Sequence, residues 1–185
     1  MKICYYCQHV LGIGHFHRSL EICRALGSRH QVTMIVGGAE IHIEEPSISL
    51  LQLPGLRMDA QFSRLTPCSS VPLETVKEQR RERLLSFAEN YQPDILIVEL
   101  YPFGRKNFRF ELDPLLERLS EQDCTVFCSL RDILVEKTEG REKFEQRAVT
   151  TLNRFFDGLL IHADPDLVTL DQTFPATVGS VYKVE

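Results

Sequence analysis

The sequence predicts a Rossmann-like α/β fold, a doubly wound and mostly parallel sheet of about six or seven strands with helices on both faces. Apolar runs of strand length alternate with longer segments whose apolar residues fall at helical spacing. The runs are apolar throughout, which is typical of parallel strands buried on both faces. With 185 residues, 43% of them hydrophobic, the chain can bury a full core, and we expect a single domain over residues 1–185.

The first half of the chain contains three predicted strands and one predicted helix. The strands are the apolar runs at residues 3–7, 32–36 and 48–53. The helix covers about residues 15–26 and is followed by Gly27, a common helix stop. Its buried stripe comprises Phe16, Leu20, Cys23 and Leu26. Residues 56–70 show no clear period, so we expect a long loop there.

The rest of the chain contains three further predicted helices. The first covers about residues 72–90, and its charged run at residues 77–83 is interpreted as a solvated face because both signs are present. The next is expected to start at Pro114 with Asp113 as its cap, since proline suits a first turn and would break a helix interior. The last covers about residues 141–155. The further strands are residues 95–98, 125–130, 158–161 and an apolar run at 178–184 that is either a terminal strand or the beginning of a linker.

Charge and hydropathy exclude some classes of partner. The net charge is −5, with acidic and basic residues interspersed, so we expect no nucleic acid partner. No apolar run approaches the roughly 20 residues of a membrane-spanning helix. The N-terminus lacks the layout of a signal peptide, so a cytoplasmic protein is expected.

The cysteines do not form a metal-binding pattern. Cys4 and Cys7 form a CxxC, but on a strand two positions that are three apart point to opposite faces. The other cysteines are scattered and have no partner at zinc-ligand spacing. We therefore expect reduced thiols, most of them buried, and no metal site.

The first predicted strand leads into a glycine-containing loop that ends in a histidine. Gly12 and Gly14 precede His15 at the expected start of the first helix, where backbone N–H groups are unpaired and can approach a ligand. The same glycines can also serve only a sharp turn, with His15 as a cap, so both interpretations stay open. Arg18, one turn further on, faces either solvent or a substrate anion.

Charged residues follow three later strands, at the carboxyl edge where open α/β sheets bind ligands. Glu99 ends an otherwise apolar strand, so it either contacts a ligand or forms a salt bridge with Arg105 that pins the loop. Arg131 and Asp132 follow the next strand and either bind substrate or tie two loops together. His162 is interpreted as a strand end held by a hydrogen bond.

Four segments together resemble bacterial predicted glycosyltransferases related to the enzyme that adds N-acetylglucosamine to a lipid-linked peptidoglycan precursor. They are QHVLGIGHFHRSLEICRAL (residues 8–26), ELYPFGRKNFRFELDPLLE (99–117), CSLRDILVEK (128–137) and FDGLLIHADPDLVTLDQTF (156–174). The first is similar to the N-terminal glycine loop and histidine of GT-B glycosyltransferases. The resemblance covers nearly the entire chain.

This resemblance implies a protein of two Rossmann-like halves. The N-terminal half binds mainly the sugar acceptor, and the C-terminal half binds mainly the nucleotide-sugar donor. Residues 1–185 then correspond to the N-terminal, acceptor-side lobe, and the donor lobe is expected in a longer protein or on a partner chain. Transfer to an acceptor hydroxyl is expected to need no cofactor and no metal, and this lobe alone is expected to be inactive. Lipid-linked acceptors also imply a possible peripheral contact with a membrane.

The implied chemistry gives His15 the role of general base or substrate-positioning group, with the Gly12 and Gly14 backbone near substrate or donor phosphate. The positive end of a helix favours a neutral ring, whereas Glu99, if close, favours the charged ring. The remaining substrate-binding candidates are Arg18, Glu99, Arg105, Arg131 and Asp132. Two alternatives stay open: a lobe of a nucleotide-sugar hydrolase, and a non-catalytic module that binds a catalytic partner.

Overall fold

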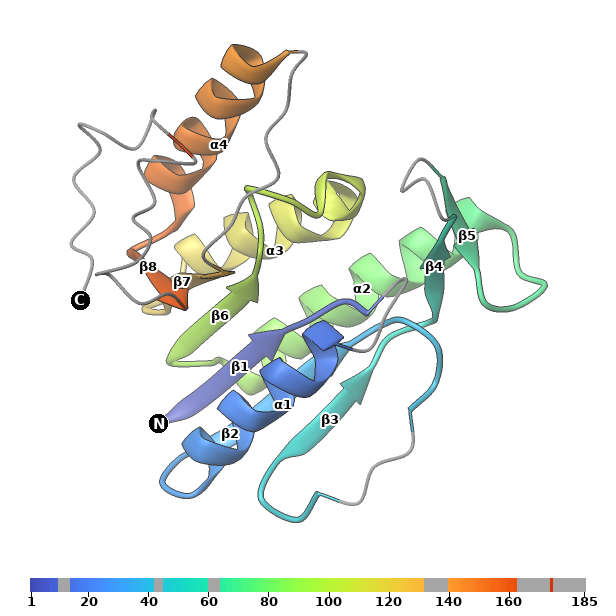
Figure 1. Ribbon diagram of the computed structural model, residues 1–185. Helices are drawn as coiled ribbons and strands as arrows, with labels where there is room; N and C mark the ends of the chain where they lie inside the picture. The colour runs from blue at the N-terminus through green and yellow to red at the C-terminus, as the bar shows by residue number, and fades with distance from the viewer. Residues whose placement is uncertain (10–13, 42–44, 60–63, 132–139, 163–173, 175–185) are drawn as a thin grey trace.

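The computed structural model describes residues 1–9, 14–41, 45–59, 64–131, 140–162 and 174, with Arg131 described by its backbone only (Figure 1). Its main sheet has six strands, all paired in parallel, in the order β3-β2-β1-β6-β7-β8. The strands are β1 (Lys2–Tyr6), β2 (Gln31–Val36), β3 (Ser49–Gln52), β6 (Ile95–Glu99), β7 (Thr125–Arg131) and β8 (Gly158–His162). The predicted fold class is therefore confirmed, whereas the run at residues 178–184 lies outside the described residues.

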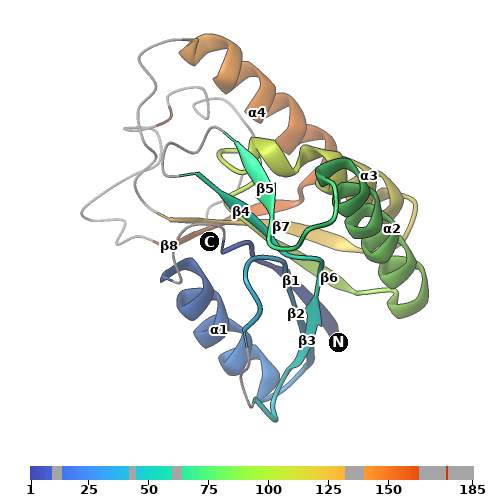
Figure 2. The ribbon, with the colours of Figure 1, turned by 90° about the vertical axis from the view of Figure 1, so that its right-hand side faces the viewer.

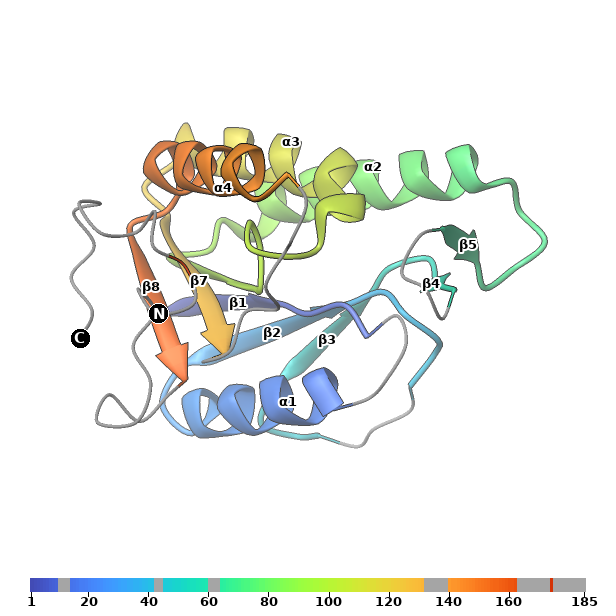
Figure 3. The same ribbon diagram turned by 45° about the horizontal axis from the view of Figure 1, so that its top comes forward.

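The helices cover both faces of this sheet. Helix α1 (Gly14–Gly27) lies on one face, and α2 (Leu73–Tyr91), α3 (Arg109–Ser120) and α4 (Arg141–Phe155) lie on the other (Figures 2 and 3). A short 3-10 helix, η1 (Lys106–Phe108), precedes α3. Within the described ranges, no helix is both long and apolar enough to cross a membrane.

Strand β1 separates two hydrophobic cores because its side chains alternate between the faces of the sheet. Tyr5 and Cys7 pack on the α1 side, whereas Cys4 and Tyr6 pack on the side of the other three helices. Cys4 and Cys7 thus lie on opposite faces, as predicted. All the cysteines are free thiols, and most are buried: Cys4, Cys7, Cys23 and Cys128.

The prediction of a long loop over residues 56–70 is wrong. Strands β4 (Leu56–Met58) and β5 (Leu65–Pro67) pair there as an antiparallel hairpin. Leu56 and Leu65 are buried, and the backbone N–H of Leu56 donates to the carbonyl of Gly37 at 2.9 Å. Each strand is only three residues long, too short for an alternating pattern to be read from the sequence.

The expected helix start at Pro114 is also wrong, because α3 begins at Arg109 and Pro114 lies inside it. A proline there removes one backbone hydrogen bond, at a cost of about 3 kcal/mol. Tertiary contacts of the first turns offset this cost. Asp113 is not a cap; its carboxylate accepts a hydrogen bond from the hydroxyl of Tyr101 and pairs with Arg109 at 3.0 Å.

The charged run at residues 77–83 is not wholly a solvated face, because Arg80 is completely buried. Its Nη2 and Nε donate to the two carboxylate oxygens of Glu111, at 2.6 and 2.7 Å. Glu111 is equally buried and accepts a third hydrogen bond from the hydroxyl of Tyr6. This buried ion pair therefore joins α2 to α3 and to strand β1.

The same guanidinium also holds three chain segments that follow strands of the sheet. Its Nη1 donates to the carbonyls of Gly37 and Pro54, at 2.9 and 2.7 Å, and its Nη2 donates to Oε1 of Gln8 at 2.9 Å. A Cβ at Gly37 would lie 2.2 Å from Nη1 of Arg80, so only glycine allows this approach. Arg80 thus fixes the chain where it leaves β1, β2 and β3.

Candidate functional site

The centre of the candidate site is the carboxylate of Glu99, at the carboxyl end of the central strand β6. Its Oε1 lies 2.6 Å from Nδ1 of His15 and accepts from Nη2 of Arg18 at 3.3 Å. Its Oε2 accepts from Nη2 of Arg105 at 2.8 Å. Three groups that can carry positive charge therefore converge on one carboxylate.

The local sequence explains why these groups meet. Residues 95–98 are apolar and bury β6, which carries Glu99 into the interior at the edge of the sheet. His15 and Arg18 lie in the first turns of α1 at a spacing of three, so they share one face of the helix. Arg105 has a φ of 57° in the turn before η1. The strand end, the helix start and the turn meet at the carboxyl edge of the sheet.

The carboxylate of Glu99 is held in its charged form. Burial by itself would raise its pKa, but the hydrogen bond from His15 and the positive charge of Arg105 outweigh burial. The pKa of Glu99 consequently lies below its ordinary value. The salt bridge between Glu99 and Arg105 is present, at 2.8 Å, whereas a contact of Glu99 with a ligand stays a prediction.

His15 and Glu99 differ in solvent exposure, and only His15 can be reached by a ligand. The side chain of His15 is 31% exposed, whereas that of Glu99 is fully buried. With Nδ1 donating to the charged Glu99, the neutral ring of His15 has its lone pair on Nε2. Nε2 has no hydrogen-bond partner among the described residues, so it can accept a proton from a bound group.

Counted over the described residues, the site carries an excess of positive charge. Arg18 and Arg105 share the single carboxylate of Glu99. In the part of the chain that the structure describes, the buried Nε atoms of both arginines have no hydrogen-bond partner. Arg105 is only 9% exposed, so this unmet donor is sheltered from solvent. The arrangement suits a negatively charged ligand group.

A second histidine lies at the same edge of the sheet. His162 ends β8, and its Nε2 is 2.8 Å from Oγ of Ser129, which in turn is 2.7 Å from the hydroxyl of Tyr5. Burial raises the pKa of Tyr5 to about 12, so its hydroxyl keeps its proton. Burial, with the positive charge of Arg18, lowers the pKa of His162. The predicted hydrogen bond at this strand end is confirmed.

His9 and Gly14, which precede and follow the undescribed residues 10–13, differ in how closely other atoms pack around them. His9 is buried, and its Nε2 lies 2.9 Å from the carbonyl oxygen of Ala39. A Cβ at Gly38 would lie 2.1 Å from the carbonyl oxygen of His9, so glycine is required for packing. At Gly14, by contrast, a Cβ would meet no atom of the described residues within 4 Å. Gly14 therefore faces open space at the start of α1.

The structure brings four of the predicted site residues into direct contact, namely His15, Arg18, Glu99 and Arg105. Gly14 adjoins them in sequence at the start of α1. The backbone of Arg131 pairs with His162 at the end of β7 and β8, but its side chain is not described. Gly12 and Asp132 lie outside the described residues.

Sequence reasoning missed two polar residues that support this edge of the sheet. Ser129 is the only hydroxyl in the otherwise apolar run at residues 126–130, and it is the parallel-strand partner of Glu99. That position could have been recognised. The contact with Tyr5 could not, because Tyr5 reaches Ser129 across the intervening strand β6. Among the described residues, no group of three or more His, Cys, Asp or Glu side chains could hold a metal ion.

No protein-family model and no curated protein matches this sequence significantly. Similar folds are found among solved structures of glycosyltransferases. A UDP-glucosyltransferase from Polygonum tinctorium, described as glucosylating indoxyl, has a TM-score of 0.54 and 12% identity over 90% of this chain and 46% of its own. MurG of Acinetobacter baumannii has a TM-score of 0.53 and 10% identity over 91% of this chain and 43% of its own.

A glycosyltransferase from Streptomyces sp. SF2575 has a TM-score of 0.52 and 14% identity over 91% of this chain and 52% of its own. This chain therefore spans about half the length of the glycosyltransferases whose fold it shares. At such low identity the likeness shows the fold alone.

Proposed function

We propose that this chain is the acceptor-side, N-terminal lobe of a GT-B glycosyltransferase that moves a sugar from a nucleotide-sugar donor to an acceptor hydroxyl. The observation that carries the proposal is the 2.6 Å contact between the partly exposed ring of His15 and the buried carboxylate of Glu99. A general base must be reachable and correctly oriented, and this pair meets both needs. The glycosyltransferase fold of the similar structures supports the same assignment.

In the proposed reaction, the acceptor hydroxyl oxygen forms a bond to the anomeric carbon of the sugar. Nε2 of His15 takes the hydroxyl proton while the bond from the anomeric carbon to the nucleoside diphosphate breaks. The diphosphate leaves with the electron pair of that bond. Glu99 stabilises the imidazolium that forms, because its charge lies next to Nδ1.

Arg18 and Arg105 extend the proposal to the charge of the substrate. Their two positive charges face one carboxylate, and their buried Nε atoms are unsatisfied within the described residues. An anionic group on the acceptor or donor would satisfy them. Most of the donor site is assigned to a C-terminal lobe or a partner chain, since this chain spans only about half of the similar enzymes.

The experiment is turnover by a protein in which this lobe is combined with its donor lobe. Replacing the base, His15→Ala, is expected to lower kcat by about 10²- to 10⁴-fold. His17→Ala is the matched control, because His17 is exposed on the same helix and makes no contact with Glu99 within the described residues. Near-normal turnover by His15→Ala would end the proposal.

A nucleotide-sugar hydrolase is the second candidate, because the same free Nε2 of His15 can deprotonate water as well as an alcohol. Product analysis with and without acceptor separates the two activities. Release of free sugar at the same rate with acceptor present would indicate the hydrolase. Calorimetry of this chain with nucleotide-sugars tests the location of the donor site, since tight binding by the lobe alone would contradict it.

A further inference from the structure

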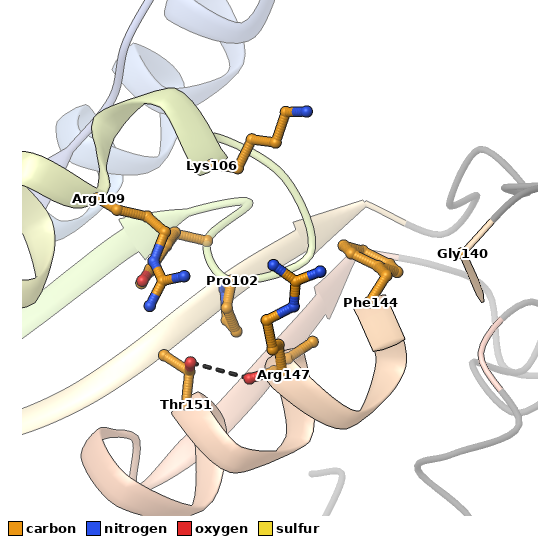
Figure 4. A pocket seen from close by; sticks show the side chains of 9 residues that line it. Pro102, Lys106, Arg109, Gly140, Phe144, Arg147 and Thr151 are labelled. Atoms are coloured by element: carbon orange, nitrogen blue, oxygen red, sulfur yellow. Dashed lines mark hydrogen bonds between the residues drawn. The ribbon is translucent and has the colours of Figure 1, made fainter. Parts of the chain in front are cut away.

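A cavity of about 260 Å³ lies between the loop after β6 and helix α4 (Figure 4). It shares no lining residue with the site around Glu99. Its wall comes from the loop and the start of α3 on one side and from α4 on the other. The basic residues of the wall are Lys106, Arg109 and Arg147, and the other lining residues are Tyr101, Pro102, Gly140, Phe144, Ala148 and Thr151.

Among the residues that the structure describes, the wall of the cavity has three basic side chains and no acidic one. Arg109 is already neutralised, because it pairs with Asp113 at 3.0 Å. Lys106 and Arg147, in contrast, form no ion pair with any residue that the structure describes. The cavity and its surroundings therefore keep two positive charges without a protein counter-ion.

The geometry of Arg147 directs its charge toward a ligand rather than toward another side chain. Its Nε donates to the backbone carbonyl of Lys143 at 3.1 Å, which orients the guanidinium, and neither Nη group has a partner among the described residues. The carbonyl of Arg147 accepts from the hydroxyl of Thr151 at 2.9 Å, so that hydroxyl has a partner already. Figure 4 shows Arg147 next to Pro102 and Phe144.

The other walls are largely apolar. Tyr101 and Ala148 are buried, and the side chains of Pro102 and Phe144 are partly buried beside them. A cavity of this size suits a small molecule, since ligand sites hold a few placed polar groups within mainly apolar walls. The ligand should therefore combine a small apolar body with a strongly anionic group.

We propose that this cavity binds a small molecule that carries a phosphate monoester. A phosphate monoester has a charge of about −1.5 to −2 at neutral pH, which matches the two unpaired cations. Its oxygens would accept hydrogen bonds from Nη of Arg147, while its organic part lies against Phe144 and Pro102. The side chain of Lys106 extends away from the cavity in Figure 4, so its Nζ would turn inward to reach the bound phosphate. The proposal does not depend on the activity assigned to His15.

The test is calorimetric titration of the chain with phenyl phosphate, accompanied by NMR shift mapping. Binding is expected to weaken with rising salt and to shift the signals of Phe144 and Thr151. Phenyl phosphate is expected to bind Arg147→Gln and Lys106→Gln each at least about fivefold more weakly. Arg83→Gln, an equal change of charge at an exposed position of α2, is the matched control and should bind as the unaltered chain does.

The result that would overturn the proposal is equal binding by Arg147→Gln and the unaltered chain, or no binding at all. Shifts that centre on the site of Glu99 would also overturn it. Arg18→Gln separates the two sites: it should leave phenyl phosphate binding intact if the cavity is the site. Folding of each variant is checked by circular dichroism, and Lys106→Gln tests the same site on a second element.

Discussion

Removal of the buried ion pair between Arg80 and Glu111 should destabilise the fold strongly. Both side chains are fully buried, so Glu111→Gln leaves a guanidinium in the interior without its counter-ion. Breaking such a pair typically costs about 3–5 kcal/mol. Arg80→Met should cost at least as much, because it also removes the donor to the carbonyl of Pro54 and to Oε1 of Gln8, whereas the carbonyl of Gly37 keeps the N–H of Leu56. Each buried acceptor left unpaired costs about 1–3 kcal/mol.

The double variant measures the pair itself. We expect its loss of unfolding free energy to be smaller than the sum of the single losses by more than about 1 kcal/mol, since the two residues share one network. Urea unfolding followed by circular dichroism gives these values. Arg83→Met, at an exposed position of the same helix, should stay within about 0.5 kcal/mol of the unaltered chain. A loss below about 1 kcal/mol for Arg80→Met, or additive single losses, would refute the reasoning.

Three further predictions concern the edge of the sheet and the thiols. Gly38→Ala should lower the free energy of unfolding by roughly 1–3 kcal/mol, because the new Cβ would meet the carbonyl oxygen of His9. The Cβ of Gly14→Ala would meet open space, so this variant should leave the free energy of unfolding unchanged or raised. Urea unfolding compares the two variants. The pKa of Glu99 is lowered on folding, so its stabilising effect is complete above the unfolded value of about 4.3 and is lost as the pH falls through the folded pKa. Glu99→Gln should consequently remove part of the acid sensitivity of the melting temperature, and an unchanged pH profile would contradict this. Cys68 is exposed and should react with a thiol reagent well before the buried cysteines, Cys4, Cys7, Cys23 and Cys128. Modification of all thiols at one rate would show that the buried cores open readily.

The sheet could be predicted from the sequence because its strands are buried on both faces and appear as continuous apolar runs. The hairpin of β4 and β5 could not, since strands of three residues carry no period. The start of α3 was placed too late because a local rule about proline was applied to Pro114. That rule is overridden by contacts distant in sequence, chiefly between Glu111 and Arg80.

The candidate site was partly predictable because charge at the end of an apolar strand is rare. Glu99 and Arg105 satisfied that criterion, and His15 followed a glycine loop. Arg80 was missed because its neighbours are charged, although its spacing of four from Val76 and from Leu84 places it on the buried stripe of α2. Only tertiary structure shows which charged residue of such a run is turned inward.

The sharing of Glu99 by His15 and Arg18 implies a thermodynamic linkage between charge recognition and base orientation. Both donate to the same oxygen, and the contact of Arg18, at 3.3 Å, is the longer of the two. A bound anion that draws Arg18 away would leave Oε1 to His15 alone. The coupling is reciprocal, so a ligand that engages His15 would in turn alter the affinity for the anion at Arg18. Under the proposed function, an acceptor with a negative charge would be bound and activated as one event.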